Sequence, residues 1–194
     1  MKKIILLLVF CFNGIYAQRK LEPITNFSDV SLGIITPFHF GNNSLNKDTS
    51  NNIGFTLNTT ILKVYEYRLG VGFESIKYKV NDNFFGNYDY INKYSYVFKL
   101  DYEINLNEQF KLFPNIAYSI CGLNYKHLDS RQAIQRGNEI RLGATIDYKL
   151  NDTFSTFIGL NYIRFHNNLN ATEENKKFYG QSNSIQLSLG FKIN

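Results

Sequence analysis

A run of strict alternation constrains the fold more than any other feature of this sequence. From Tyr94 to Ile104 every second residue is apolar or aromatic, and the residues between them are mostly polar, with Val97 as the exception. A period of two predicts a β-strand with one apolar face and one polar face. The run is about as long as the 9–11 residues that a tilted strand needs to cross a bilayer.

The same alternation recurs along the chain and predicts eight strands. Their apolar faces are Val30, Leu32 and Ile34; Ile53, Phe55, Leu57 and Ile61; Leu69, Val71 and Phe73; the run from Tyr94 to Ile104; Leu112, Ile116, Tyr118 and Ile120; Ile140, Leu142, Ala144, Ile146, Tyr148 and Leu150; Ile158, Leu160 and Tyr162; and Ile185, Leu187, Leu189, Phe191 and Ile193. In the third strand the phase changes near Ser75. Ile76, Tyr78 and Val80 continue its apolar face there, so we expect a β-bulge.

The connections between these strands alternate in length. Short connections fall near residues 63–66, 105–109 and 151–153, and long ones near 39–51, 81–89, 126–137 and 166–182. Tight turns at one end and long loops at the other are typical of outer-membrane barrels. We therefore predict an all-β fold, an eight-stranded antiparallel up-and-down transmembrane β-barrel with both termini at the turn end. Asp101–Phe110 and Asp147–Phe154 share a pattern that predicts repeated hairpin geometry.

The glycines indicate which face lies inside. Seven mid-strand glycines share the polar phase: Gly33, Gly54, Gly70, Gly72, Gly143, Gly159 and Gly190. Gly122 does not share it. The interior of an eight-stranded barrel is only just wide enough for side chains, so a residue without one fits best there. The large apolar residues would overfill that interior. We therefore expect the polar phase to face the lumen and the apolar phase to face lipid.

Charged residues of both signs share the inward phase. They are Arg68, Glu74, Lys99, Asp101, Glu103, Glu139, Arg141, Asp147, Lys149 and Lys192. Because buried charges are tolerated only when they are paired, we expect a plug of salt bridges and no open channel. Aromatic residues near the strand ends fit interfacial girdles. These are Tyr65, Tyr67, Phe110, Phe113 and Phe154 at the turn end, and Tyr78, Phe84, Phe85, Tyr90, Tyr125 and Phe165 at the loop end.

The first residues have the features of an export signal. Lys2 and Lys3 precede an apolar run over residues 4–12, and cleavage after Ala17 fits a small-residue site. The alternatives are an uncleaved anchor and a lipoprotein signal ending at Cys11. We expect residues 1–17 to be a signal peptide, 18–27 a short periplasmic segment and 28–194 the barrel domain. No later stretch is apolar enough for a transmembrane helix.

Loss of the signal peptide changes the charge and the cysteine count. The formal charge falls from +5 to +3 because two lysines leave with the signal. A basic balance in an exported protein suits contact with anionic lipid headgroups or lipopolysaccharide, and we expect no nucleic acid partner. Cys121 becomes the only cysteine, so no intramolecular disulfide can form.

On these residues the chain resembles the small eight-stranded outer-membrane β-barrel domain family of Gram-negative bacteria. The resemblance covers nearly all of residues 28–193, and Ser184–Ile193 looks like the C-terminal signal that the outer-membrane assembly machinery reads. That family usually ends on an aromatic residue, whereas this chain continues for three residues after Phe191. The resemblance implies the outer membrane of a Gram-negative bacterium as its location, contact with outer-membrane lipid and lipopolysaccharide, and recognition by the assembly machinery. We expect a monomer.

Candidate chemistry is sparse. His39, His127 and His166 fall at the loop end without metal-ligand spacing, so we predict no metal and no cofactor. Residues 164–168 resemble the histidine segment of lipid A acylhydrolases, but Asn168 stands where that family has its serine. His127 with Asp129 and Ser130 also lacks the pattern, and the inward thiol of Cys121 suits packing. We therefore predict a non-catalytic barrel with a structural or binding role through its extracellular loops, whose ligand the sequence does not identify. A lipid A-modifying barrel enzyme and a small porin-like permeability protein are the alternatives.

Overall fold

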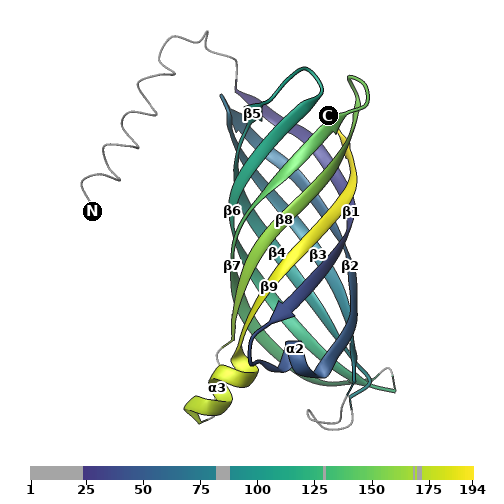
Figure 1. Cartoon of the computed structure of the whole chain (residues 1–194), viewed down its shortest axis with the longest axis vertical. Coiled ribbons are helices and arrows are strands. Elements are labelled where there is room, and N and C mark those ends of the chain that lie inside the picture. Colours follow the sequence, from purple (N-terminus) through teal and green to yellow (C-terminus); the bar gives the residue numbers. More distant parts are fainter. Residues whose placement is uncertain (1–23, 82–87, 129, 168, 170–171) are drawn as a thin grey trace, which may run out of the picture.

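The computed structural model describes residues 24–81, 88–128, 130–167, 169 and 172–194, which form a closed antiparallel barrel (Figure 1). Its strands are β1 (Thr25–Phe40), β2 (Thr49–Val64), β3 (Tyr67–Val80), β4 (Tyr90–Tyr102), β5 (Ile104–Asn105), β6 (Phe110–His127), β7 (Ser130–Lys149), β8 (Phe154–Asn167) and β9 (Gln181–Ile193). Two helices, α2 (Ser44–Asp48) and α3 (Glu173–Gly180), lie in the connections. The expected signal peptide lies outside the described residues. In the described part of the chain, no helix is both long and apolar enough to span a membrane.

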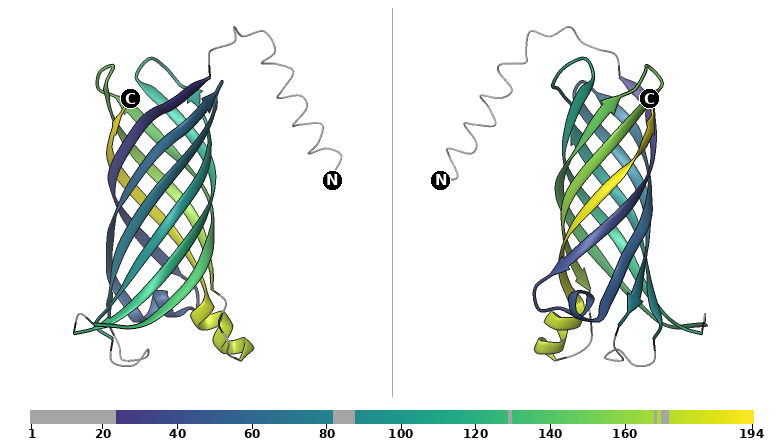
Figure 2. Two further views of the ribbon diagram at one scale, coloured as in Figure 1. Left: turned by 180° about the vertical axis from the view of Figure 1, so that it is seen from behind. Right: turned by 45° about the vertical axis from the view of Figure 1, so that its right-hand side comes forward.

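The barrel has eight strands because β4 and β5 are two parts of one strand. Both pair with β6, and the interruption falls at Glu103. The first and last strands close the cylinder through a ladder that runs from Val30–Ile193 to Phe40–Asn183. The start of β1, the C-terminus and the short turns lie at one end, here called the turn end (Figure 2). Helices α2 and α3 lie at the opposite end, called the loop end. The predicted eight-stranded antiparallel up-and-down barrel is confirmed.

Two turns at the turn end have the same geometry. The side-chain oxygen of Asn107 accepts hydrogen bonds from the backbone N–H groups of Gln109 and Phe110, at 2.9 and 2.8 Å. Asn151 accepts the equivalent bonds from the residues two and three positions later, at 2.9 and 2.8 Å. Asparagine favours such turns because its side chain can mimic a backbone acceptor. The repeated hairpin geometry predicted from the sequence is therefore confirmed.

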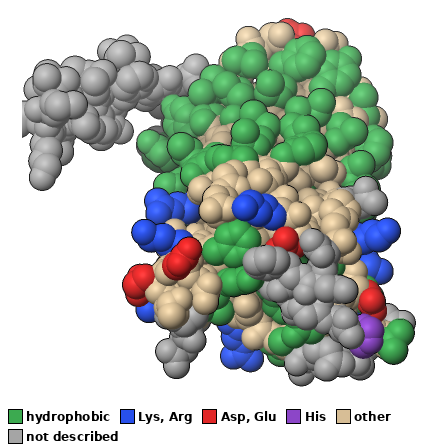
Figure 3. All heavy atoms as spheres, turned by 60° about the horizontal axis from the view of Figure 1, so that its bottom comes forward, with side chains coloured by type: hydrophobic (Ala, Val, Ile, Leu, Met, Phe, Trp, Pro, Cys, Tyr) green, Lys and Arg blue, Asp and Glu red, His purple; other side chains and the backbone are tan. Residues whose placement is uncertain are grey.

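The predicted outward face is apolar and exposed. Phe98, Leu142 and Leu189, from three different strands, are 53%, 63% and 51% exposed. On the face shown in Figure 3, hydrophobic side chains form a continuous green region, here called the apolar belt. Four of the aromatic residues expected in the turn-end girdle are exposed: Tyr65, Tyr67, Phe110 and Phe154.

Paired glycines on the inward face leave room for an aromatic ring. Gly33 on β1 pairs with Gly190 on β9, and a Cβ atom at Gly33 would lie 2.8 Å from the ring of Phe157. Phe157 is 6% exposed and points into the lumen. The predicted inward direction of these glycines is therefore confirmed.

The bulge expected in the third strand is not there. The β3–β4 ladder runs without a register shift from Tyr67 to Lys79. Ile76 and Tyr78 are 1% and 0% exposed, so both point into the lumen and do not continue the outward apolar face. The irregularities of the β2–β3 ladder lie where β2 has extra residues, after Ser50 and after Thr60. The apolar residues of β3 therefore move from its outward face to its inward face after Ser75, because the interior of the barrel becomes apolar at this level.

The loop-end aromatic girdle was also wrongly predicted. Tyr78, Tyr125 and Phe165 are at most 5% exposed and face the lumen. Phe113, expected in the turn-end girdle, is 3% exposed and also faces inward. Tyr90 is half-buried on the outer surface, and residues 84 and 85 lie outside the described residues. Four of the aromatics assigned to the girdles therefore belong to the interior of the barrel.

The long loop expected near residues 126–137 is a hairpin. β6 extends to His127 and β7 begins at Ser130. The polar residues on both faces of this segment suggested a loop, but the two strands remain paired through them. The strands extend past the apolar belt here, so neither face needs to be apolar.

Candidate functional site

A network of buried ion pairs crosses the middle of the lumen. The carboxylate of Glu139 on β7 pairs with Lys93 on β4 and with the guanidinium of Arg141, which is 2.6 Å away. Arg141 also contacts Glu74 on β3 at 2.8 Å, and Gln186 on β9 donates a 3.1 Å hydrogen bond to that carboxylate. All five side chains are buried. Because they come from four strands, the network ties opposite walls together.

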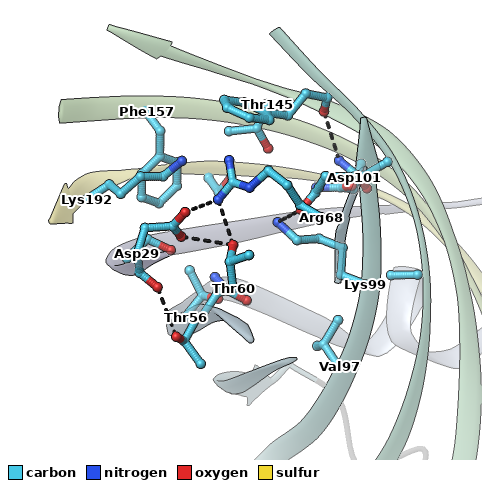
Figure 4. A pocket seen from close by; sticks show the side chains of 18 of the residues that line it. Asp29, Thr56, Thr60, Arg68, Val97, Lys99, Asp101, Thr145, Phe157 and Lys192 are labelled. Carbon is cyan, nitrogen blue, oxygen red and sulfur yellow. Dashed lines mark hydrogen bonds and ion pairs between the residues drawn. The ribbon is translucent and has the colours of Figure 1, made fainter. Parts of the chain in front are cut away.

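A second group of polar contacts lies nearer the turn end. The guanidinium of Arg68 pairs with Asp29 and donates a 2.6 Å hydrogen bond to the hydroxyl of Thr60 (Figure 4). Its charged carbon stands 4.5 Å from the ring centre of Phe113, within the range of a cation–π contact. The ring of the inward-facing Phe113 therefore stabilises the guanidinium of Arg68, which the sequence predicted to lie in the lumen.

Further pairs complete the charge balance of this region. Lys192 pairs with Asp147 and lies 4.5 Å from the centre of the Phe113 ring. Lys99 lies 3.1 Å from Asp101. The sequence predicted a lumen filled with paired charges, and this prediction is confirmed for the buried members of its set. Lys149 instead lies at the turn-end mouth, where it pairs with the exposed Asp152.

Glu103 closes the network at the turn end, between β4 and β5. Its carboxylate lies 2.9 Å from Lys63 and 2.7 Å from Lys111. Burial alone raises the pKa of Glu103, but the hydrogen bonds from the two lysines outweigh burial and hold the pKa below its ordinary value. Glu103 therefore stays ionised at neutral pH.

The space left by these side chains is small. A cavity of about 70 Å³ lies among Asp29, Arg68, Lys99 and Asp101, and a wider one of about 280 Å³ opens at the turn-end mouth. The inner cavity has room for only a few water molecules. It is too small for a solute of metabolite size.

An apolar cluster occupies the loop-end half of the lumen. A cluster of nine buried residues fills it, here called the apolar plug: Ile35, Leu45, Ile76, Tyr78, Ile91, Cys121, Leu123, Tyr125 and Phe165. Leu45 comes from α2, whose first turn is capped by the side chain of Asn43 on the backbone N–H of Asn46 at 3.0 Å. The short helix thus lies across the mouth of the barrel and contributes to the plug.

The wall opens on one side at the loop end. Pairing between β1 and β2 stops at Ile35–Gly54, although β1 continues to Phe40 and pairs with β9. A groove of about 440 Å³ lies between the diverging strands, lined by residues 36–38, 52 and 53. Ile35 and Ile76, which flank Gly54 on the inward face, are both 1% exposed. The plug therefore closes the lumen at the inner end of this groove.

The three histidines occupy separate positions. The Nδ1 atom of His39 on β1 lies 3.0 Å from the Ser182 hydroxyl. His127 lies at the end of β6, 3.4 Å from Asp89, and His166 is exposed on β8. In the described residues, no three His, Cys, Asp or Glu side chains gather as a metal site would require. The structure does not describe residue 129, which belongs to the considered group of His127, Asp129 and Ser130. It also does not describe residue 168, which stands where lipid A acylhydrolases have their serine. Cys121 packs in the plug.

Comparison with known proteins identifies the fold. No protein-family model and no curated protein matches the sequence. Neisserial surface protein A superimposes with a TM-score of 0.65 at 12% identity, covering 89% of this chain and 99% of that one. The fold is that of the small eight-stranded outer-membrane β-barrels. OprG of Pseudomonas aeruginosa (TM-score 0.52, 11% identity, 85% and 93% covered) and Ail, the attachment invasion locus protein of Yersinia pestis (0.51, 11%, 87% and 99%), are also similar.

Sequence reasoning missed four charged members of these ion-pair networks: Asp29, Lys63, Lys93 and Lys111. Lys93 shares the inward phase with Ser95 and Lys99, so extending the alternation by one step would have identified it. Asp29 likewise shares a phase with Ser31 and Gly33. The apolar plug had a weaker signal, because Ile76 and Tyr78 alternate with lysines just as an outward apolar face does.

Proposed function

We propose that this chain is a non-catalytic integral protein of the outer membrane of a Gram-negative bacterium. In this proposal residues 1–17 are removed on export, the turn end faces the periplasm and the loop end faces outside. The exposed apolar belt around a polar, charge-filled lumen is the observation that carries the proposal. A soluble barrel would have the opposite arrangement.

The belt has a large energetic consequence in water. Each exposed apolar side chain that leaves water contributes about 25 cal/mol per Å² of buried apolar area. Residues such as Leu32, Leu142 and Phe191, each at least 59% exposed, repeat around the circumference. A patch this large on a soluble monomer would drive aggregation, whereas lipid tails cover it at no such cost.

The role we favour is binding through the loop end by a monomeric barrel. The strands provide a rigid scaffold, and binding residues concentrate on loops that such a scaffold holds. The charge network and the apolar plug weigh against a permeability role, because they occupy the lumen at two levels. The lipid A-modifying alternative would require a hydroxyl nucleophile beside His166.

Cell fractionation of the full-length precursor tests the location. We expect the mature protein in the outer membrane, lacking residues 1–17 by N-terminal sequencing. It should also migrate faster unheated than boiled on a detergent gel, because a closed ladder has no edge from which to unfold. Recovery of the mature protein in the soluble periplasm would contradict the proposal.

A further inference from the structure

The outward face changes character along the strands towards the loop end. On neighbouring strands β3, β4 and β6, Phe73, Tyr96 and Ile120 lie side by side in one row of the apolar belt. Four residues further along β3, Lys77 has replaced the apolar side chain. That step is about 13 Å along the strand. The inward residues at this level belong to the apolar plug, so the belt ends here.

Three lysines lie near Tyr90, just beyond this boundary. Lys79, Tyr90 and Lys126 are directly paired across the three strands. The Nζ atom of Lys77 lies 4.2 Å from the centre of the Tyr90 ring, and that of Lys126 lies 5.8 Å from it. Lys77 and Lys79 are exposed, and Lys126 is half-buried. On the face shown in Figure 3, Lys and Arg side chains lie between the green region and the loop end.

These cations have no carboxylate partner in the described residues. No ion pair joins Lys77, Lys79 or Lys126 to any residue of the described ranges, in contrast to the fully paired lumen. The carboxylate of Asp89, which precedes Tyr90, accepts a 2.8 Å hydrogen bond from the backbone N–H of Leu128 and faces His127. Like charges gathered at one place repel one another, so this cluster is suited to binding an anion.

We propose that Lys77, Lys79 and Lys126 form a site for a phosphate group of a lipid A headgroup in the outer leaflet. This inference rests on the proposed membrane location and orientation. Lysine binds phosphate as a compact charge, and basic side chains at a membrane surface attract anionic headgroups. The neighbouring ring cluster explains why the phosphate belongs to a lipid. Phe73 stacks against Tyr94 and contacts Tyr96, with ring centres 6.2 and 5.6 Å apart, and this apolar surface suits acyl chains.

Native mass spectrometry of the mature protein in a non-ionic detergent tests this site. The probes are lipid A, lipid A with both phosphates removed, and inorganic phosphate. We expect the triple variant K77Q/K79Q/K126Q to bind lipid A at least about tenfold more weakly than the wild-type protein. The variant K77R/K79R/K126R keeps the charge and should keep the affinity. Dephosphorylated lipid A should bind wild-type protein as weakly as lipid A binds the glutamine variant.

A matched control removes three lysines from the same end of the barrel. Lys47, Lys176 and Lys177 lie on α2 and α3, so K47Q/K176Q/K177Q makes the same charge change away from the belt. Its affinity for lipid A should stay within about twofold of wild type. Equal losses in both glutamine variants, or none in either, would overturn the site. Displacement of lipid A by millimolar inorganic phosphate would overturn the lipid assignment. Wild-type protein that migrates as a folded barrel but does not bind lipid A would contradict this inference alone, whereas a soluble periplasmic protein would contradict the proposed function.

Discussion

The two halves of the lumen are filled by different kinds of side chain. Towards the turn end, charged residues from opposite walls pair with one another, as Arg141 on β7 does with Glu74 on β3. Towards the loop end, the buried residues of the apolar plug pack against one another. Ion pairs specify which strands face each other, whereas apolar packing requires only that the space be filled. The same ladder of strands therefore supports two interiors of opposite chemistry.

The boundary between the halves coincides with a change on the outer surface. On β3 the inward residues change from Glu74 to Ile76 and Tyr78, while the outward residues change from Phe73 to Lys77. The strand behaves as a membrane strand before this point and as a soluble strand after it, with its apolar side inward. The position of this change along a strand is the position at which that strand extends beyond the apolar belt.

Removal of one buried charge should have the largest effect. Glu139→Gln leaves Lys93 and Arg141 without their shared carboxylate, and breaking a buried pair costs about 3–5 kcal/mol. Urea unfolding in lipid vesicles, followed by the gel shift of unheated samples, measures the loss because the protein has no Trp. Glu108→Gln, in an exposed turn, is the matched control and should unfold as wild type. Equal stabilities would show that the charge network does not hold the turn-end half.

A cavity in the apolar plug should cost somewhat less. Leu123 is 1% exposed, so Leu123→Ala should lower the free energy of unfolding by about 3 kcal/mol. Leu128, which is 80% exposed, provides the control Leu128→Ala, for which we expect no change. The same urea titration measures both. If Leu123→Ala were tolerated as well as its control, the loop-end half would not be a packed interior.

Substitutions on the two faces of β4 should differ in how much stability they cost. Leu100→Arg places a charge in the apolar belt, at a cost of about 2–4 kcal/mol. Lys99→Leu removes a lumen charge that lies 3.1 Å from Asp101 and is itself partly exposed, so we expect a smaller loss. Folding yield into vesicles ranks the two variants. A reversed rank would mean that the assignment of inside and outside is wrong.

Acid should weaken only the charged half of the lumen. The stability change expected here, from the loss of the Glu103 ion pairs, is the smallest of these effects. The lowered pKa of Glu103 means that its contribution is present above the ordinary glutamate pKa and is lost as the pH falls through the lowered value. Glu103→Gln should therefore cost about 1 kcal/mol at pH 7, since Lys63 and Lys111 are partly exposed and screened. The difference from wild type should shrink as the pH falls below the ordinary glutamate range, because Glu103 then becomes protonated. A difference that persists unchanged in acid would exclude the ionised carboxylate as its cause.

The outward face was predictable because the environment of the belt is uniform. Outward residues on every strand, such as Phe98 and Leu100 on β4, have the same apolar surroundings. The apolar residues of the belt therefore recur with a period of two. The inward charges followed from the same phase. The apolar plug could not be predicted in this way, because Ile76–Lys79 alternates as a membrane strand does. Only the pairing with neighbouring strands shows which of its sides faces inward. The ion-pair partners, such as Glu139 with Lys93, depend on strand registers that one sequence does not specify.

Conductance in planar lipid bilayers tests most directly whether the lumen is closed at both levels. The purified wild-type protein, confirmed as folded by its gel shift, should give no stable single-channel steps in concentrated KCl. The inner cavity holds only about 70 Å³, and the plug lies beyond it. Steady, large steps from pure protein would contradict a closed lumen and would favour a permeability role over a binding role.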